Sequence, residues 1–326
     1  MRMDELPMII ESTYKTPYLF TNPHIDTMYP YFFRKTKAPN YQRERIHLSD
    51  GDFLDLDYLR NNNDKLVILS HGLEGSSQSK YIQALAKYLF ENSYDVLSWN
   101  CRGCSGEPNL VLRSYHSGVS YDLKDVVSSA INTKRYKELH LVGFSMGGNI
   151  TLKYLGDYSN DLPNETKSAI AISTPLHLSD SADSLENGFN KIYSKHFIWS
   201  LAQKVKQKKQ QFKHYQPDLV QFYKMNTIRE FDNLFTAPLN SYKDANDYYN
   251  HCSSYFILDK IKVPTLIINA QNDPFLEGRC YPTDLLEDNK TVHLESPDFG
   301  GHVGFRSKDE VYWSERRVLD FIESGF

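Results

Sequence analysis

The stretch Gly143-Phe144-Ser145-Met146-Gly147 decides the fold, because it joins an apolar run, 139–144, to a helix-like run, 149–155. A strand, a sharp turn and a helix are the context in which the pattern G-x-S-x-G exposes a serine hydroxyl as a nucleophile. The two glycines allow the strand and the helix to approach closely around a serine whose backbone is strained. Five residues are a weak signal alone, so the interpretation depends on partners for Ser145 elsewhere in the chain.

Short apolar runs alternate with amphipathic helical patterns around this turn. Residues 43–48 and 53–59 flank an Asp-Gly pair and predict a hairpin. The alternation as a whole predicts a mostly parallel sheet covered by helices on both faces. The further strands are expected at 65–70, 95–100, 139–144, 169–173, 265–270 and 291–295, and helices at 80–92, 121–131, 149–155 and 309–324.

Residues 175–252 interrupt this alternation. They contain no buried-strand pattern, only polar and aromatic-rich helical sequence such as 191–209 and 218–231. A helical insertion within an α/β sheet is most simply interpreted as a cap over the strand ends. We therefore expect one α/β domain over residues 1–326 with a helical cap inserted at 175–252, preceded by an irregular start.

Composition limits the class of protein. The 326 residues carry a formal net charge of −4, which argues against nucleic acid as the main partner. No apolar run approaches the roughly 18 residues that span a bilayer. The first fifteen residues contain acids and do not resemble a signal peptide, and four cysteines are too few for a disulfide scaffold. These features predict a soluble, cytoplasmic protein.

Cys101 and Cys104 have the C-x-x-C spacing of a redox or metal pair. No second such pair accompanies them, and no helix opens at the first cysteine after the strand 95–100. A tight turn built on Gly103 and Gly106 is the simpler interpretation. We expect neither a metal nor a cofactor.

A nucleophilic serine needs a base, and the base needs an orienting carboxylate. In this topology the chain order is serine, acid, histidine, with the last two on loops after late strands. Asp273 directly follows the strand 265–270, and His302 lies in a glycine-rich loop after the strand 291–295. The sequence therefore predicts that Ser145, Asp273 and His302 meet at the carboxyl edge of the sheet.

Each of these residues has a simpler alternative role. Ser145 could be a buried turn serine, Asp273 a turn former before a proline, and His302 a surface residue. Glu277 and Asp284 compete as acids and His293 as a base, but the acids do not start a loop and the histidine lies inside a strand. Strand context and chain order together favour the triad.

Two backbone amides are candidates to stabilise a developing oxyanion. The segment His71-Gly-Leu-Glu-Gly75 ends an early strand and matches an H-G-x-x-G loop, so the Leu73 amide is the first candidate. The residue after the nucleophile, Met146, supplies the second. His71 itself is more simply a histidine that braces the loop.

Several motifs extend over most of the chain, and with them the sequence resembles the YheT-like branch of the α/β-hydrolase superfamily. This resemblance implies an α/β-hydrolase fold, with Ser145 as nucleophile, Asp273 as acid and His302 as base. It implies carboxylic-ester hydrolysis without a cofactor, and in some members acyl transfer to alcohols. The motifs lie at residues 22–27, 71–76, 100–106, 115–118, 143–149, 231–238, 272–275 and 300–305.

Some positions in these motifs carry no assigned chemistry. Asp26 and Cys104 stand where related sequences often have other small or polar residues, with no evident effect on catalysis. His24 and His116 belong to motifs that are best interpreted as loop bracing.

The sequence thus predicts a serine esterase, acylglycerol-lipase-like, acting on a small-molecule or lipid-derived ester through an acyl-enzyme. The alternatives are an alcohol acyltransferase with the same triad and a non-catalytic, ligand-binding member of the fold. An apolar stripe is expected to pack on the sheet or to line an acyl pocket; it comprises Phe189, Ile192, Tyr193, Phe197, Ile198 and Leu201.

A basic run follows the stripe and predicts a solvated helix face, with docking to anionic lipid headgroups as the alternative. It comprises Lys204, Lys206, Lys208, Lys209 and Lys213.

Overall fold

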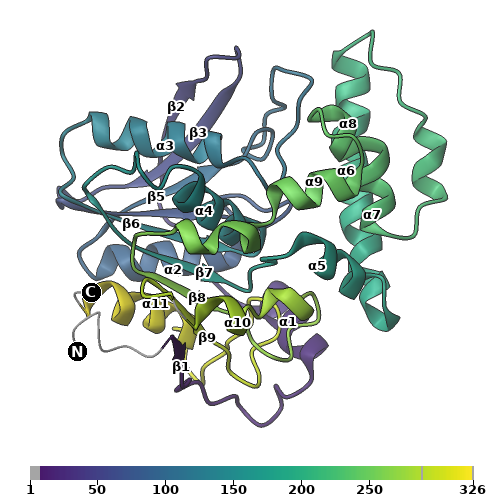
Figure 1. The fold of residues 1–326 in the computed structure, drawn as a ribbon. Helices are drawn as coiled ribbons and strands as arrows, with labels where there is room; N and C mark the ends of the chain where they lie inside the picture. Colours follow the sequence, from purple (N-terminus) through teal and green to yellow (C-terminus); the bar gives the residue numbers. More distant parts are fainter. Residues whose placement is uncertain (1–7, 288, 325–326) are drawn as a thin grey trace.

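A nine-stranded sheet runs through the molecule (Figure 1) in the order β1-β9-β8-β7-β6-β4-β5-β3-β2. The computed structural model describes residues 8–287 and 289–324; the first residues, on which part of the signal-peptide prediction rests, lie outside them. The strands are β1 (Ile9–Ile10), β2 (Gln42–His47), β3 (Phe53–Leu59), β4 (Lys65–Ser70), β5 (Asp95–Asn100), β6 (Glu138–Phe144), β7 (Thr166–Ile172), β8 (Thr265–Ile268) and β9 (Val292–Glu295).

The strands from β5 to β1 in this order are parallel, while β3 pairs antiparallel with β5 and with β2. Strands β4 to β9 are mostly buried on both faces, as expected for a sheet that is covered by helices on both sides. The predicted hairpin is confirmed as β2 and β3, and the predicted parallel strands are confirmed within a few residues.

Helices cover both faces of the sheet (Figure 1). On one face, α3 (Ser120–Asn132) and α4 (Met146–Asp157) share a hydrophobic cluster with the strands. On the other face, α2 (Lys80–Glu91) and α11 (Trp313–Glu323) contribute to a second cluster. The predicted mostly parallel sheet flanked by helices is therefore confirmed. Helix α11 begins later than predicted, because Tyr312 and Glu315 form a capping box at its start.

The segment between β7 and β8 is helical and has its own apolar cluster. Figure 1 shows the helices of residues 191–239 together at one side of the sheet. The prediction of one helix over 218–231 is wrong, because Thr227 and Glu230 form a capping box that starts a new helix. The elements are α5 (Leu178–Leu185), η2 (Gly188–Asn190), α6 (Lys191–Gln211), η3 (Leu219–Tyr223), α7 (Ile228–Phe231), η4 (Asp232–Thr236), α8 (Ala237–Leu239), α9 (Ala245–Cys252) and η5 (Ser254–Lys260).

The start of the chain is more regular than predicted. Helix α1 (Pro23–Phe33) begins after Asn22, whose side chain accepts hydrogen bonds from the amides of His24 and Ile25. An N-cap asparagine followed by proline at the first helical position is a common helix start. The short strand β1 extends the sheet beside β9. Helix α1 also supplies Thr27, whose hydroxyl accepts a hydrogen bond from the amide of His302.

Candidate active site

Ser145 lies at the turn between β6 and α4, with φ 53° and ψ −123°. A non-glycine residue with positive φ is strained, and here the strain presents the hydroxyl outside the sheet. The flanking glycines are required by close packing. A Cβ on Gly143 would lie 2.3 Å from the Gly147 carbonyl oxygen, and one on Gly147 would lie 2.3 Å from the Ser70 carbonyl oxygen.

The structure brings the three predicted site residues together. Nε2 of His302 lies 2.9 Å from Oγ of Ser145. Nδ1 of the same ring lies 2.8 Å and 3.1 Å from the carboxylate oxygens of Asp273, which is almost fully buried. A carboxylate can only accept here, so Nδ1 carries the proton and Nε2 is free to accept from the serine hydroxyl.

The loop that carries His302 is fixed by side chains from three distant segments. The His302 amide donates to Oγ1 of Thr27 in α1 at 2.9 Å. The amide of Gly301 donates to Oδ1 of Asn272, and the amide of Val303 donates to Oγ of Ser173, each at 2.9 Å. The sequence interpretation missed these supports, although Thr27 and Asn272 both lie within recognised motifs.

Two further residues near this loop were not assigned a role. The ring of Phe275 lies over His302, with centroids 4.1 Å apart. Asp26 is completely buried against Gly301 and Gly304, and its carboxyl oxygens make no hydrogen bond of normal geometry to a described residue. Burial, helped by the charge of Asp273, raises the pKa of Asp26 to about 7.

The two predicted oxyanion donors border the same space. Leu73 follows β4 and lines the cavity beside Ser145, and Met146 is the first residue of α4. Among the described residues, neither amide donates to an acceptor. His71 braces this loop as expected: Nδ1 donates to the Gly72 carbonyl at 2.7 Å and Nε2 accepts from the Cys101 amide at 3.1 Å. Burial lowers the pKa of His71 to about 4, so it stays neutral.

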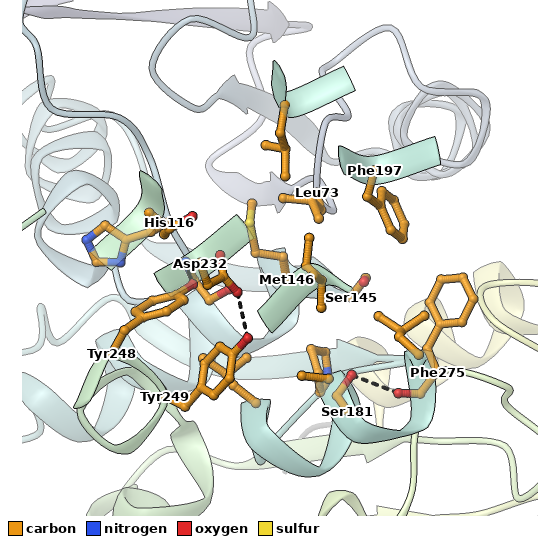
Figure 2. A pocket seen from close by; sticks show the side chains of 18 of the residues that line it. Leu73, His116, Ser145, Met146, Ser181, Phe197, Asp232, Tyr248, Tyr249 and Phe275 are labelled. Atoms are coloured by element: carbon orange, nitrogen blue, oxygen red, sulfur yellow. Dashed lines mark hydrogen bonds between the residues drawn. The ribbon is translucent and has the colours of Figure 1, made fainter. Parts of the chain in front are cut away.

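A cavity opens beside Ser145 and is shown in Figure 2. Phe197 and Phe275 lie at one side of the serine in this view, and His116, Tyr248 and Tyr249 at the other. Most of its remaining wall is apolar and comes from the helices between β7 and β8. These apolar wall residues include Leu178, Ala182, Leu185, Leu201 and Ile228.

The end of the cavity near His116 is polar but internally hydrogen-bonded. Tyr249 donates to Oδ2 of Asp232 at 2.7 Å, and the Ser117 amide donates to Tyr248 at 3.0 Å. Burial raises the pKa of Asp232 to about 6 and lowers the pKa of His116 to about 3. The helices therefore enclose a mainly apolar space with one polar end.

The apolar stripe of α6 divides in a way that the sequence did not predict. Phe197 and Leu201 line the cavity and Ile198 is buried, but Phe189 and Ile192 are exposed to solvent. The prediction that the stripe packs on the sheet or lines a pocket is therefore wrong for Phe189 and Ile192.

The prediction that the basic run forms a solvated helix face is wrong for two of its lysines, Lys204 and Lys208. Lys204 lies 3.2 Å from Glu74 and 2.9 Å from Sγ of Cys104. Lys208 is buried and donates to Oδ1 of Asn109 at 2.8 Å. The loops after β4 and β5 supply these partners, which sequence spacing cannot reveal.

Cys101 and Cys104 lie in a turn closed by a hydrogen bond between the Cys104 amide and the Cys101 carbonyl, 2.9 Å long. All four cysteines are free. Within residues 8–287 and 289–324, no group of three or more metal-binding side chains comes together, and no helix is long and apolar enough to cross a membrane.

The fold and the site define a class of protein. The family described as the alpha/beta hydrolase fold matches residues 65–279, and the chain belongs to this family, whose members include esterases and lipases. The chain is 34% identical to YheT of Escherichia coli (strain K12), covering 93% of this chain and 91% of that protein. The resemblance to the YheT-like branch is thus confirmed.

Other relatives agree with this placement. Phospholipase ABHD3 of Mus musculus is 29% identical, covering 93% of this chain and 75% of that protein. Among solved structures, the esterase Pf2001 of Pyrococcus furiosus superposes with a TM-score of 0.59 at 16% identity, covering 98% and 99% of the two chains. This second likeness concerns the fold alone.

Proposed function

We propose that the protein hydrolyses carboxylic esters through Ser145, His302 and Asp273. The observation that carries this proposal is the 2.9 Å contact between the serine hydroxyl and an imidazole whose other nitrogen is held by a buried carboxylate. A nucleophile, a base and an orienting acid within hydrogen-bond reach, beside an open cavity, are what acyl transfer requires.

In this mechanism His302 takes the proton of Ser145 as the serine oxygen attacks the ester carbonyl. The amides of Leu73 and Met146 stabilise the oxyanion of the tetrahedral intermediate. His302 then protonates the departing alcohol, which leaves an acyl-enzyme on Ser145. Water, deprotonated by the same imidazole, releases the acid, while Asp273 stabilises the imidazolium.

The substrate follows from the cavity. We assign residues 175–252 as a cap that supplies most of the apolar wall, and an apolar wall beside the serine suits the acyl part of an ester. A relative named as a phospholipase supports a lipid-derived ester, with small-molecule esters as the wider class. No step in this chemistry calls for a cofactor. The cytoplasmic location remains a prediction from the sequence.

The assignment is tested by replacing each member of the triad and measuring hydrolysis of p-nitrophenyl esters from acetate to palmitate. We expect Ser145→Ala to lower kcat by at least about 10³-fold, with similar losses for His302→Ala. Ser128→Ala, at an exposed position in α3, serves as the matched control and keeps full activity. A Ser145→Ala enzyme that turned over these esters at the wild-type rate would refute the proposal.

Adding an alcohol to the same assay separates the hydrolase from an acyltransferase. The hydrolase releases free acid as the main product, whereas an acyltransferase accumulates the new ester. If the protein bound these esters but hydrolysed none of them, it would be a ligand-binding member of the fold.

A further inference from the structure

Seven large apolar side chains are exposed beside the site, on α1, on α6 and on η2, which leads directly into α6. On α1 they include Phe32 and Phe33, which are 60% and 66% exposed, and on α6 Trp199, which is 65% exposed. An exposed apolar group of this size usually marks an interaction surface. We call it the α1–α6 patch; its members are Ile25, Tyr31, Phe32, Phe33, Phe189, Ile192 and Trp199.

The two halves of the patch are in contact. The ring of His24 in α1 lies 4.4 Å from that of Phe189, and the ring of Tyr31 lies 6.3 Å from that of His196 in α6. On α6, Ile192, His196 and Trp199 follow one another at helical spacing and share one exposed face. Figure 1 shows α1 on the same side of the molecule as the start of α6. The patch is therefore one continuous surface.

We propose that the α1–α6 patch docks the protein onto an anionic lipid surface. Lysines accompany the aromatic side chains: Lys35 and Lys37 follow α1, and Lys191 and Lys195 lie on α6. All four are exposed, and none pairs with a carboxylate of the described residues. Residues 27–43 and 187–217 contain no Asp or Glu at all.

This combination of side chains fits a lipid headgroup region better than a second protein surface. Aromatic rings insert at the boundary between headgroups and acyl chains, while flexible lysines reach anionic phosphates. The patch therefore complements an anionic bilayer in both polarity and charge.

Contacts with the rest of the protein fix the carboxyl end of α1, which carries part of the patch. Nζ of Lys80 donates to the carbonyls of Tyr31 and Phe32, at 2.9 Å and 3.0 Å, near the end of α1. The next residue after the helix, Arg34, is buried in an ion pair with Glu315 of α11. The aromatic side chains are thus presented by a helix anchored at its carboxyl end.

The patch also borders the site. Nδ1 of His24 lies 3.3 Å from the hydroxyl of Tyr193, whose ring is 4.7 Å from that of Phe275. Phe275 in turn lies against His302. Docking at this surface would place the cavity next to the lipid that supplies an ester. Binding at the patch needs no chemistry at Ser145, so this proposal and the proposed hydrolysis fail separately.

The test is to sediment the 326-residue chain with vesicles of phosphatidylcholine, with and without about one-third phosphatidylglycerol. We expect binding to the anionic vesicles and a blue shift of Trp199 emission, absent in Trp199→Phe. The double variant Phe32→Ser, Phe33→Ser lowers partitioning by at least about ten-fold. The quadruple Lys→Glu variant at 35, 37, 191 and 195 loses the preference for anionic vesicles.

Two controls keep the result interpretable. Tyr223→Ser removes an even more exposed aromatic side chain outside the patch and leaves binding unchanged. Far-UV circular dichroism and a melting temperature that match the wild type show that all patch variants fold, whether or not the protein hydrolyses esters. The proposal is overturned if the wild type ignores anionic vesicles, or if the double variant binds them equally well. A dimer in solution that the patch variants dissociate, without vesicle binding, would assign the patch to a second copy of the chain instead.

Discussion

At the scale of single residues, the site depends on how the His302 loop is held. Its amides are bound by Thr27, Asn272 and Ser173, which come from three separate segments. The sequence predicted the three residues of the proposed chemistry because chain order and strand context constrain them. It could not predict the hydrogen bonds of Thr27, Asn272 and Ser173. Each of these side chains accepts one hydrogen bond, and a single contact of this kind produces no recognisable pattern in the sequence.

Thr27→Val tests the support from α1. The change keeps the shape but removes the acceptor of the His302 amide and the donor to the Pro23 carbonyl, and losing such partly buried hydrogen bonds costs about 1–3 kcal/mol. We expect kcat to fall about ten-fold with KM little changed, while Thr27→Ser retains near wild-type turnover. Steady-state kinetics and a melting curve check this. Equal turnover by the valine and serine variants would show that the contact is not needed.

Asp26→Asn tests the buried carboxyl beside the same loop. The pKa of Asp26 is raised to about 7 in the folded protein, so folding favours its protonated form. The protonated carboxyl makes its full contribution to the free energy of unfolding below about pH 4, and this contribution is lost as the pH rises through about 7. Asparagine does not titrate. The Tm of Asp26→Asn relative to wild type should therefore increase from about pH 4 to about pH 8, and a constant difference would contradict the assignment.

At the scale of elements, the sheet was predictable and the surrounding supports were not. Strands β4 to β8 each contain a short apolar run, which is typical of a buried parallel strand. Helix α1 escaped prediction because it is short, contains Pro30 and exposes aromatic side chains that hide its periodicity. The contacts of Lys204 and Lys208 were missed because their partners lie in loops about a hundred positions away along the chain.

Lys204→Met tests the contact between α6 and the loop after β4. Lys204 pairs with Glu74, which follows the proposed oxyanion donor Leu73 and also accepts from Ser200 of α6. Losing this partly buried pair should cost about 1–3 kcal/mol and loosen both segments. We expect a lower Tm and a several-fold loss in kcat/KM. Lys206→Met, on the same helix and without an ion pair among the described residues, should change neither.

At the scale of the whole molecule, the cavity exists only because the helices after β7 close over the sheet. Its wall combines Leu73 and Met146, which lie next to the sheet, with Leu185, Phe197 and Ile228 from the helices between β7 and β8. The loss of strand patterns in the sequence predicted helices in this segment. The sequence could not show which side chains of these helices face Ser145 and which, such as Trp199, face solvent, because helical spacing alone gives no direction in space.

The central claim, that Ser145 is the nucleophile activated by His302, is tested most directly by covalent labelling. The protein is treated with a fluorophosphonate, and the modified peptide is identified by mass spectrometry. The account predicts one adduct per chain, on Ser145, with labelling abolished in Ser145→Ala and at least about 10³-fold slower in His302→Ala. An adduct on another residue, or labelling of Ser145 at an unchanged rate without His302, would contradict it.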